Sequence, residues 1–334
     1  MKLLSKRIPS PGGSVFSNVD VKTPFLYQGV LSAVLIAAIM LSAVITVEAS
    51  PHRDKIISFE AQPGYFALSI DGTPVPLYIS DQDHPGVIRA YRDLQADIER
   101  VTHNQPDLHI GEIPNTDRII IAGTVGLSPV IDRLSDEGAI DISGLEGKWE
   151  KFHIEVVSNP VEGVGEALVI VGSDRRGTTF GIYEMSKQIG VSPWHWWADV
   201  PVVHQSDIYV SPERYTIGEP GVQYRGIFIN NENPGLLGWV VTRYGWFTHE
   251  FYEHVFELIL RLQGNYLWPA MWGKAFHDDD PMNPKLADEY GVVIGYSHHE
   301  PMMRAHIEWS RYGEGPWDYS QNEERLREFW TEGI

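Results

Sequence analysis

The chain has 334 residues, 43% of them hydrophobic, and carries a formal net charge of -19 at pH 7. This length accommodates roughly two domains of ordinary size, and the acidic excess argues against nucleic acid as a partner, since binding to phosphates requires Lys and Arg. The absence of cysteine excludes disulfides and thiolate metal sites.

An export signal or a membrane anchor is predicted within residues 1–49. Residues 29–47 contain no charged side chain, and four basic residues against one acid precede them. This asymmetry favours a cytoplasmic N-terminus with the remainder outside the cytoplasm. Val47-Glu48-Ala49 resembles a small-x-small cleavage site, yet the apolar run is nearly long enough to cross a bilayer. We therefore expect a secreted or membrane-anchored protein whose membrane contact, if the signal is not cleaved, is through residues 29–47.

Residues 51–215 are predicted to form a small α/β sandwich domain. Residues 65–80 alternate apolar and polar side chains around Asp71-Gly72, a pattern typical of a β-hairpin with a positive-φ turn. Apolar residues then recur at helical spacing from Val87 to Val101. Three further strands are predicted, at residues 118–122, 152–157 and 167–172.

The segment Gly172-Ser-Asp-Arg-Arg-Gly-Thr178 links the last of these strands to a predicted helix. Free N–H groups at such a helix start can hold an anion, and Arg175 and Arg176 could add a bidentate grip on a carboxylate. The glycine spacing fits neither a dinucleotide fingerprint nor a P-loop. The alternative is an ordinary capped turn with two solvated arginines.

Aromatic residues are abundant, with eleven Trp and fifteen Tyr. Aromatic faces can stack on sugars, although a tryptophan-rich core gives the same count. Three of the tryptophans fall within Trp194-His-Trp-Trp-Ala-Asp199 and cannot all face one core. We expect that one of them lines a cleft or that they seal an interface to the next domain.

Residues 222–334 are predicted to hold the first three or so βα units of an incomplete (β/α)8 TIM-type barrel. Three apolar, strand-like runs end in polar or aromatic segments, and helical patterns follow the first two strands. These segments are Asn230-Asn-Glu-Asn233, Trp268-Pro-Ala-Met-Trp272 and Ser297-His-His-Glu-Pro-Met-Met-Arg304. A barrel of this type places its active site at the carboxyl ends of its strands.

Glu232 could act as an acid, a base or a hydroxyl-binding carboxylate, and the alternative is a solvated loop glutamate. His298, His299 and Glu300 lack the one-turn spacing of a zinc-binding helix, so hydrogen bonding to sugar hydroxyls is favoured. The run His277-Asp-Asp-Asp280 has no EF-hand pattern and is interpreted as a polar loop. No metal site is therefore predicted.

From Tyr224 onward the chain resembles glycoside hydrolase family 115, the xylan α-1,2-glucuronidases. The resemblance rests on Tyr224–Asn230, Asn265–Gly273, Asn283–Tyr290, Ser297–Arg304 and the run from Asn322 to Gly333. Residues 172–178 and 194–201 resemble the same family's N-terminal domain, so the resemblance covers roughly residues 60–334.

The resemblance implies removal of (4-O-methyl-)glucuronic acid from xylan, with inversion and without a cofactor. An inverting enzyme holds two carboxyl groups about 6.5–9.5 Å apart, and Glu232 and Glu300 are the candidates within this chain. The sugar contacts implied by the resemblance are Asn230, Glu232, Trp268, His298, His299, Glu300 and Arg304. Arg175 and Arg176 are further candidates for binding the substrate carboxylate, because of their positive charge. The family pattern also implies an aspartate where this chain has Asn231.

The resemblance further places the family's acid and base on later barrel strands, beyond Ile334, so the 334-residue chain is expected to be a truncated, inactive portion. Alternatives are a non-catalytic or vestigial polypeptide that binds acidic xylan, and a hexosaminidase-like glycosidase. An open sheet edge favours association, so a homodimer is a further expectation.

Overall fold

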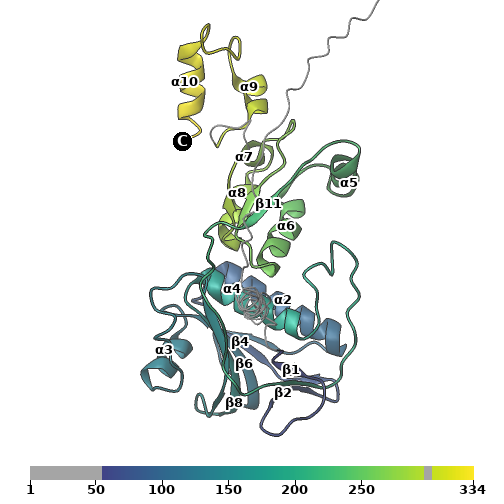
Figure 1. Ribbon diagram of the computed structural model, residues 1–334, viewed down its shortest axis with the longest axis vertical. Helices are drawn as coiled ribbons and strands as arrows, with labels where there is room; N and C mark the ends of the chain where they lie inside the picture. Colours follow the sequence, from purple (N-terminus) through teal and green to yellow (C-terminus); the bar gives the residue numbers. More distant parts are fainter. Residues whose placement is uncertain (1–54, 297–302) are drawn as a thin grey trace, which may run out of the picture. The chain divides into compact units, whose positions relative to one another are not determined.

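The computed structural model describes residues 55–296 and 303–334, and the chain from Lys55 onward is described as one unit. Two sheets make up the first part of this unit (Figure 1). The four-stranded antiparallel sheet has the order β1-β9-β2-β3, formed by β1 (Ile57–Ser58), β2 (Phe66–Ile70), β3 (Thr73–Pro74) and β9 (Ile208–Val210). The six-stranded sheet has the order β10-β7-β8-β6-β4-β5, formed by β4 (Leu77–Ile79), β5 (Leu108–Ile110), β6 (Thr116–Thr124), β7 (Phe152–Ser158), β8 (Val164–Gly172) and β10 (Tyr215–Ile217).

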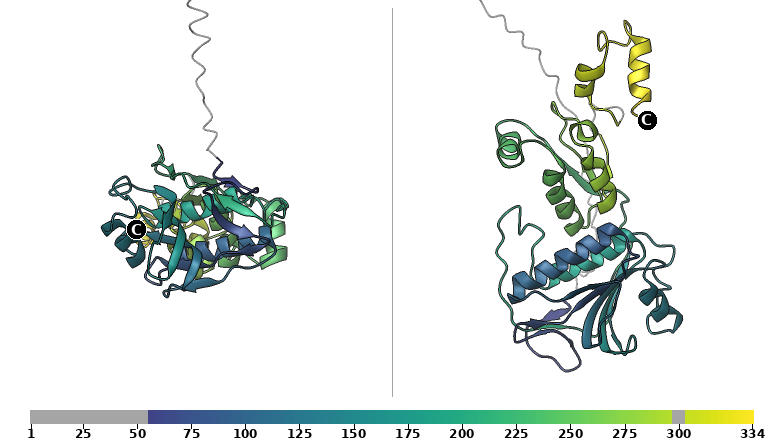
Figure 2. Two further views of the ribbon diagram at one scale, coloured as in Figure 1. Left: turned by 90° about the horizontal axis from the view of Figure 1, so that it is seen from below. Right: turned by 180° about the vertical axis from the view of Figure 1, so that it is seen from behind.

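Helices cover both faces of the six-stranded sheet (Figure 2). On β6, Ile120 packs on the side of α2 (Pro85–Thr102) and α4 (Arg175–Gln188), whereas Ile119 and Ile121 pack with α3 (Pro129–Asp136). Successive strand residues point to opposite faces, so a strand buried on both sides is apolar throughout. The predicted α/β layering of this segment and its three later strands are confirmed.

The predicted hairpin is present but shorter than expected. Asp71 and Gly72 have φ values of 50° and 75°, and Ser69 pairs with Pro74 across the turn. The chain then leaves this sheet, and Leu77–Ile79 joins the other one, parallel to β5 and β6. Proline offers no N–H to a ladder, and Pro74 and Pro76 therefore favour this departure.

The loop before α4 is a capped turn. One carboxylate oxygen of Asp174 accepts a hydrogen bond from the Gly177 N–H (2.7 Å), and the other accepts from the Glu150 N–H (2.9 Å). The helix start is thereby occupied by the chain's own carboxylate. Residues 177–186 of α4 are all buried, because the sheet covers one side of the helix and further helices cover the other.

The third sheet consists of three parallel strands in the order β11-β12-β13, namely β11 (Gly226–Phe228), β12 (Tyr266–Trp268) and β13 (Val293–Ile294). The helices between and beside them are α5 (Gly235–Tyr244), α6 (His249–Arg261), α7 (Phe276–Asp279) and α8 (Met282–Tyr290). Helix α8 begins at Met282, one residue before Asn283. The Asn283 side chain is buried and donates to the carbonyl oxygens of Phe247 and Phe276.

Helices α6 and α8 pack on the layer formed by α2 and α4. Arg261 pairs with the buried Asp97 at 2.7 Å, and the Tyr183 hydroxyl donates to Asp93 at 2.6 Å. At Gly86 a Cβ atom would lie 2.1 Å from the Glu289 carbonyl oxygen, so only glycine permits this close approach of α2 to α8.

The last described segment holds α9 (His306–Tyr312) and α10 (Glu323–Thr331), with a small core of Trp309, Leu326 and Phe329. Across residues 55–296 and 303–334, no helix combines the length and apolar character needed to cross a membrane. The apolar run at residues 29–47 lies outside the described residues.

Candidate active site at the carboxyl ends of the parallel strands

The carboxyl ends of β11 and β12 bring together three of the predicted site residues. Phe228 is in register with Trp268, so the residues that follow β11 lie beside the end of β12. Asn230 and Glu232 are exposed there, while Ile229 between them and the strand is buried and donates to the Trp268 carbonyl oxygen at 2.9 Å. The polar groups therefore lie at the edge where barrel-type enzymes place their chemistry.

Asn231 has a positioning role in this edge. Its side-chain oxygen accepts hydrogen bonds from the N–H groups of Met271 (3.0 Å) and Trp272 (3.1 Å), and its amide nitrogen donates to the Trp272 carbonyl oxygen at 3.0 Å. An aspartate would point an oxygen without a proton at that carbonyl. The amide thus fits its buried position and fixes the loop after β12.

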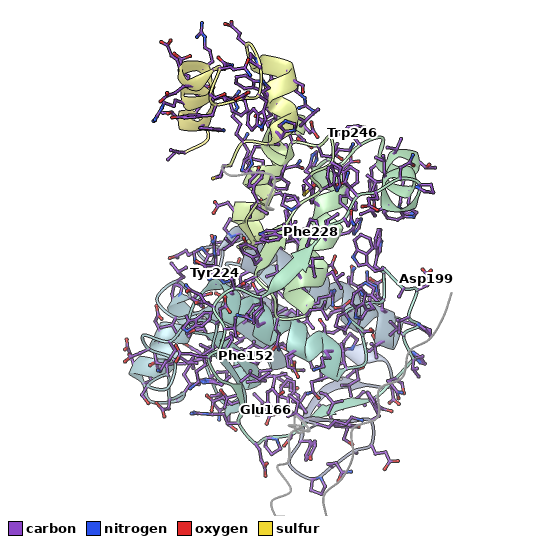
Figure 3. All side chains as sticks on the ribbon, turned by 45° about the horizontal axis from the view of Figure 1, so that its top comes forward. Phe152, Glu166, Asp199, Tyr224, Phe228 and Trp246 are labelled. Carbon is purple, nitrogen blue, oxygen red and sulfur yellow. The ribbon has the colours of Figure 1, made fainter. Side chains whose placement is uncertain are left out.

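One face of the three-stranded sheet is aromatic. Phe228 meets Trp268 edge to face with ring centres 5.8 Å apart, and Tyr224 lies 5.7 Å from Tyr266. Tyr224 and Phe228, labelled in Figure 3 toward the two ends of β11, are 53% and 46% exposed. Exposed aromatic rings beside polar groups are suited to stacking on the apolar faces of a sugar.

Glycine at position 295 permits this aromatic face. The Trp268 indole N–H donates to the Tyr266 hydroxyl at 2.7 Å, and a Cβ atom at residue 295 would lie 1.6 Å from that hydroxyl oxygen. A larger residue at 295 would displace the two rings.

His298, His299 and Glu300 lie outside the described residues. Next to them along the chain, Tyr296 is hydrogen-bonded to Nδ1 of His277, and their rings are stacked with centres 5.8 Å apart. Burial lowers the pKa of His277, which favours the neutral imidazole at neutral pH.

The carboxylates of the acidic run after His277 already contact other groups of the same chain. Asp279 accepts from the Trp246 indole N–H and pairs with Arg311, and Asp280 accepts from the His249 N–H at 2.9 Å. Among residues 55–296 and 303–334, no group of three or more His, Asp or Glu side chains is arranged to hold a metal ion.

Arg304 is held within the last segment of the chain. It forms ion pairs with Glu308 (3.3 Å) and Glu332 and lies 4.0 Å over the Phe329 ring. Its charge is thus largely matched by carboxylates of the same segment.

Ile334 lines a cavity of about 400 Å³ together with Arg304 and His277. Its own side chain is 91% exposed and aliphatic, so Ile334 can contribute shape to this cavity but no acid or base. The family resemblance implies an acid-base pair beyond Ile334, and the described residues do not test this. The location of that pair therefore stays a prediction.

Arg175 and Arg176 are not brought to the strand ends that carry Asn230 and Trp268. Arg176 pairs with the buried carboxylate of Glu150 at 2.5 Å and donates to the Gly291 carbonyl oxygen at 3.3 Å. Arg175 donates to the Asp288 carbonyl oxygen at 2.9 Å. The carbonyl partners Asp288 and Gly291 lie just before β13, at its amino end.

Glu150 also binds the residues that precede the other two strands. Arg225, directly before β11, pairs with it at 2.5 Å, and the Asn265 amide, directly before β12, donates to it at 2.6 Å. Glu150 therefore gathers the amino ends of the parallel strands at a buried ion cluster. In a parallel sheet this is the end opposite the candidate site.

Lys274 is a residue that sequence reasoning missed. It follows the Trp268–Trp272 segment, is 5% exposed, and its ammonium lies 3.9 Å over the Trp246 ring. Burial lowers its pKa. The only sequence signal was a basic residue soon after a predicted strand end, which is too common to single out.

Comparisons with known proteins indicate the class of protein to which this chain is similar. Residues 217–334 match the family described as Glycosyl hydrolase family 115. The chain is also similar to the solved structure of a family GH115 4-O-methyl-alpha-glucuronidase, BtGH115A, with specificity for decorated arabinogalactans. That match has 35% identity and a TM-score of 0.68, and covers 80% of this chain and 34% of the other. No curated protein matches the chain.

Together, the parallel strands, the family match and this likeness place the chain among the glycoside hydrolases. The chain belongs to glycosyl hydrolase family 115, as its sequence predicts, and it spans about a third of the length of BtGH115A (34%).

Two other solved structures share less with the chain. CpGH84D is 7% identical with a TM-score of 0.40, covering 83% of this chain and 42% of its own. A mutant Streptomyces plicatus beta-hexosaminidase in complex with the product GlcNAc is 11% identical with a TM-score of 0.37, covering 71% and 47%. Neither likeness supports an inference about this chain.

Proposed function

We propose that this chain is a portion of an exported, cofactor-independent glycoside hydrolase that removes (4-O-methyl-)glucuronic acid side chains from xylan with inversion. The observation that carries the proposal is the exposed Glu232 at a strand end, beside Asn230 and the aromatic face of Trp268, in a chain of family 115. The family membership leaves the hexosaminidase-like alternative without support.

In this proposal Glu232 supplies one carboxyl group and Trp268 provides a platform for a sugar ring. Asn230, His298 and His299 offer hydrogen bonds to hydroxyls. The second carboxyl group is Glu300 or one from a later strand, held about 6.5–9.5 Å away so that a water molecule fits between base and sugar.

The three parallel strands are proposed to be the first of a (β/α)8 barrel. Three βα units do not close a barrel, so we expect the purified 334-residue chain to release no 4-O-methylglucuronate from glucuronoxylan above a heat-killed control. Release by the chain alone would overturn this part of the proposal and would assign both carboxyl groups to residues 222–334, with none needed beyond Ile334.

The role of Glu232 is tested in a complete family member, with Glu232→Gln introduced at the matching position. Loss of an acid or base should lower kcat by about 10²–10⁴-fold. The matched control is Glu250→Gln, which changes an exposed glutamate in the first turn of α6 and should leave kcat unchanged. An unchanged kcat in the Glu232 variant would show that this residue is a solvated loop glutamate.

A second candidate substrate comes from BtGH115A, which is described as specific for decorated arabinogalactans. The same complete enzyme should be assayed on glucuronoxylan and on glucuronate-bearing arabinogalactan at equal uronate concentration. A higher kcat/KM on xylan supports the proposal. A higher kcat/KM on arabinogalactan would mean that arabinogalactan, and not xylan, is the substrate.

A non-catalytic acidic-xylan-binding or vestigial polypeptide is the remaining alternative. It would bind uronate-bearing xylan, yet the Glu232→Gln change would leave the activity of a complete family member unaffected.

A further inference from the structure

A second pocket lies away from the candidate active site. It has a volume of about 550 Å³, within the usual range for small-ligand sites, and the Trp196-Trp197 segment and helix α5 line it. None of Asn230, Glu232 and Trp268 contributes to it. The tryptophan cluster noted in the sequence therefore lines a cavity as well as an interface.

The tryptophans of this pocket are fixed in different ways. Trp197 donates its indole N–H to the His254 carbonyl oxygen at 3.1 Å, and Trp196 stacks on the His254 ring with centres 3.8 Å apart. These two contacts join the segment to α6. Trp239 of α5 is 40% exposed, and its ring centre lies 5.8 Å from that of Trp197. Trp239 thus presents the open aromatic surface.

Arg243 is positioned in this pocket by aromatic rings instead of by a counter-ion. Its guanidinium carbon lies 5.3 Å from the Trp196 ring centre and 5.7 Å from that of Trp239. Within the part of the chain that the structure describes, the Arg243 guanidinium forms no ion pair and no hydrogen bond. Five N–H donors in a planar fork are therefore available to a ligand.

The other ionisable groups that line the pocket are Arg100, Asp199 and His195. Arg100 also lines it, and its ion pair with the buried Asp97 is shared because Asp97 pairs with Arg261 as well. Asp199 is the one carboxylate among the lining residues, and it forms no ion pair with the described residues. Burial lowers the pKa of the His195 imidazole.

We propose that this pocket is a second carbohydrate-binding site, which binds the carboxylate of a uronic acid at Arg243 and stacks a sugar ring on Trp239. The combination fits an acidic sugar because a guanidinium fork matches a carboxylate while an open indole face matches a pyranose. In a protein with a net charge of -19, an acidic polysaccharide meets repulsion over much of the surface, and an unpaired arginine offers a local exception.

The test measures binding, so it is independent of the proposed hydrolysis. The full 334-residue chain, with Glu232→Gln to prevent turnover, is titrated by calorimetry with a 4-O-methylglucuronate-bearing xylo-oligosaccharide. The neutral xylo-oligosaccharide of equal length provides the comparison. Arg243→Ala should weaken binding of the acidic ligand by about tenfold or more and change the neutral ligand by less than about twofold.

The proposed role of Trp239 has a matched control at Trp194, in the segment that carries Trp196 and Trp197. Trp239→Ala should weaken both ligands, whereas Trp194→Ala should weaken neither, because Trp194 is 45% exposed but does not line the pocket. Arg243→Lys keeps a positive charge near the rings and should still lose affinity for the acidic ligand, since an ammonium lacks the planar fork.

Three results would overturn the proposal. They are no detectable binding by the parent chain, equal losses on both ligands in the Arg243 variants, and equal effects of the Trp194 and Trp239 variants. The chain could bind the acidic ligand as expected while the complete enzyme does not hydrolyse glucuronate substrates. That result would refute the proposed function, but it would still support this second binding site.

Discussion

The two ends of the parallel strands β11 to β13 differ in how their polar groups are used. At the amino ends, the Glu150 carboxylate is fully buried and binds Arg176, Arg225 and Asn265. At the carboxyl ends, Asn230 and Glu232 are exposed. One set of strands therefore carries a closed, stabilising end and an open end available to a ligand, which is the division of labour known for βα barrels.

The largest effect should come from the closed end. Glu150→Ala would leave two buried or half-buried arginines without their counter-ion, and breaking a buried ion cluster in this way costs about 3–5 kcal/mol. We expect a fall of that size in the free energy of unfolding measured in urea. Glu166→Ala removes a half-exposed partner of Arg118 (3.4 Å) and should cost less than about 1 kcal/mol. Similar losses of unfolding free energy in both variants would show that the Glu150 cluster is no more stabilising than a surface ion pair.

Neighbouring asparagines provide a sharper test at the open end. Asn231→Ala removes an acceptor for two backbone N–H groups and a donor to the Trp272 carbonyl oxygen, so we expect a loss of about 1–3 kcal/mol. Asn230→Ala changes an exposed side chain and should alter stability by less than about 0.5 kcal/mol. Urea denaturation of both variants measures the difference, and equal stabilities would remove the positioning role assigned to Asn231.

The stability that the interface between α2, α4 and α6 contributes should depend on pH. Burial, with the nearby Glu257 carboxylate, raises the pKa of Asp93 to about 6. The folded state then binds the proton more tightly than the unfolded state does, so stability falls as the pH rises from about 4 to about 6. In Asp93→Asn the decrease in the free energy of unfolding between pH 4 and pH 6 should be smaller by about 1–2 kcal/mol. This figure allows for the 21% exposure of the Asp93 side chain, which weakens the effect of burial.

The control for this pH dependence is Asp141→Asn. Hydrogen bonds from Ser143 lower the pKa of Asp141, so its titration lies below this pH range and the fall should persist in the variant. Unfolding free energies at pH 4, 5, 6 and 7 distinguish the two. An unchanged pH profile in Asp93→Asn would show that another group causes the fall.

The smallest stability effect is expected at Glu232. Glu232→Gln replaces an exposed carboxylate that forms no hydrogen bond or ion pair within the described residues, so the free energy of unfolding should change by less than about 0.5 kcal/mol. A loss above about 1 kcal/mol would make Glu232 a structural residue of the open end.

Sequence patterns predicted the long strands β6, β7 and β8 and the position of the polar segment after β11, because alternation and strand-end polarity are local, but they did not predict the short strands β1, β5, β9 and β10. The run from Val87 to Val101 became α2, and Glu232 came to the predicted edge. The Glu150 cluster could not be predicted, since Glu150 and Asn265 are 115 residues apart and no periodicity links them.

The placement of Arg175 and Arg176 was also beyond local patterns. Two arginines at a helix start indicate an anion site only if that start faces a ligand. Here the packing of α4 directs them to Glu150 and to the residues before β13. Which end of a sheet a helix approaches is decided by tertiary contacts.

The burial of residues 177–186 of α4 on every side has a consequence for the exchange of parts between relatives. A helix with no solvent-facing stripe packs against neighbours on both sides, here the sheet on one side and α6 on the other. Recombination that joined this first segment to the strands of another family member at about residue 220 would pair α4 with a foreign α6. Productive chimaeras should therefore carry α4 and α6 from one parent, and the practical crossover point lies after α6, because a crossover before β8 would separate β8 from its partners β6 and β7.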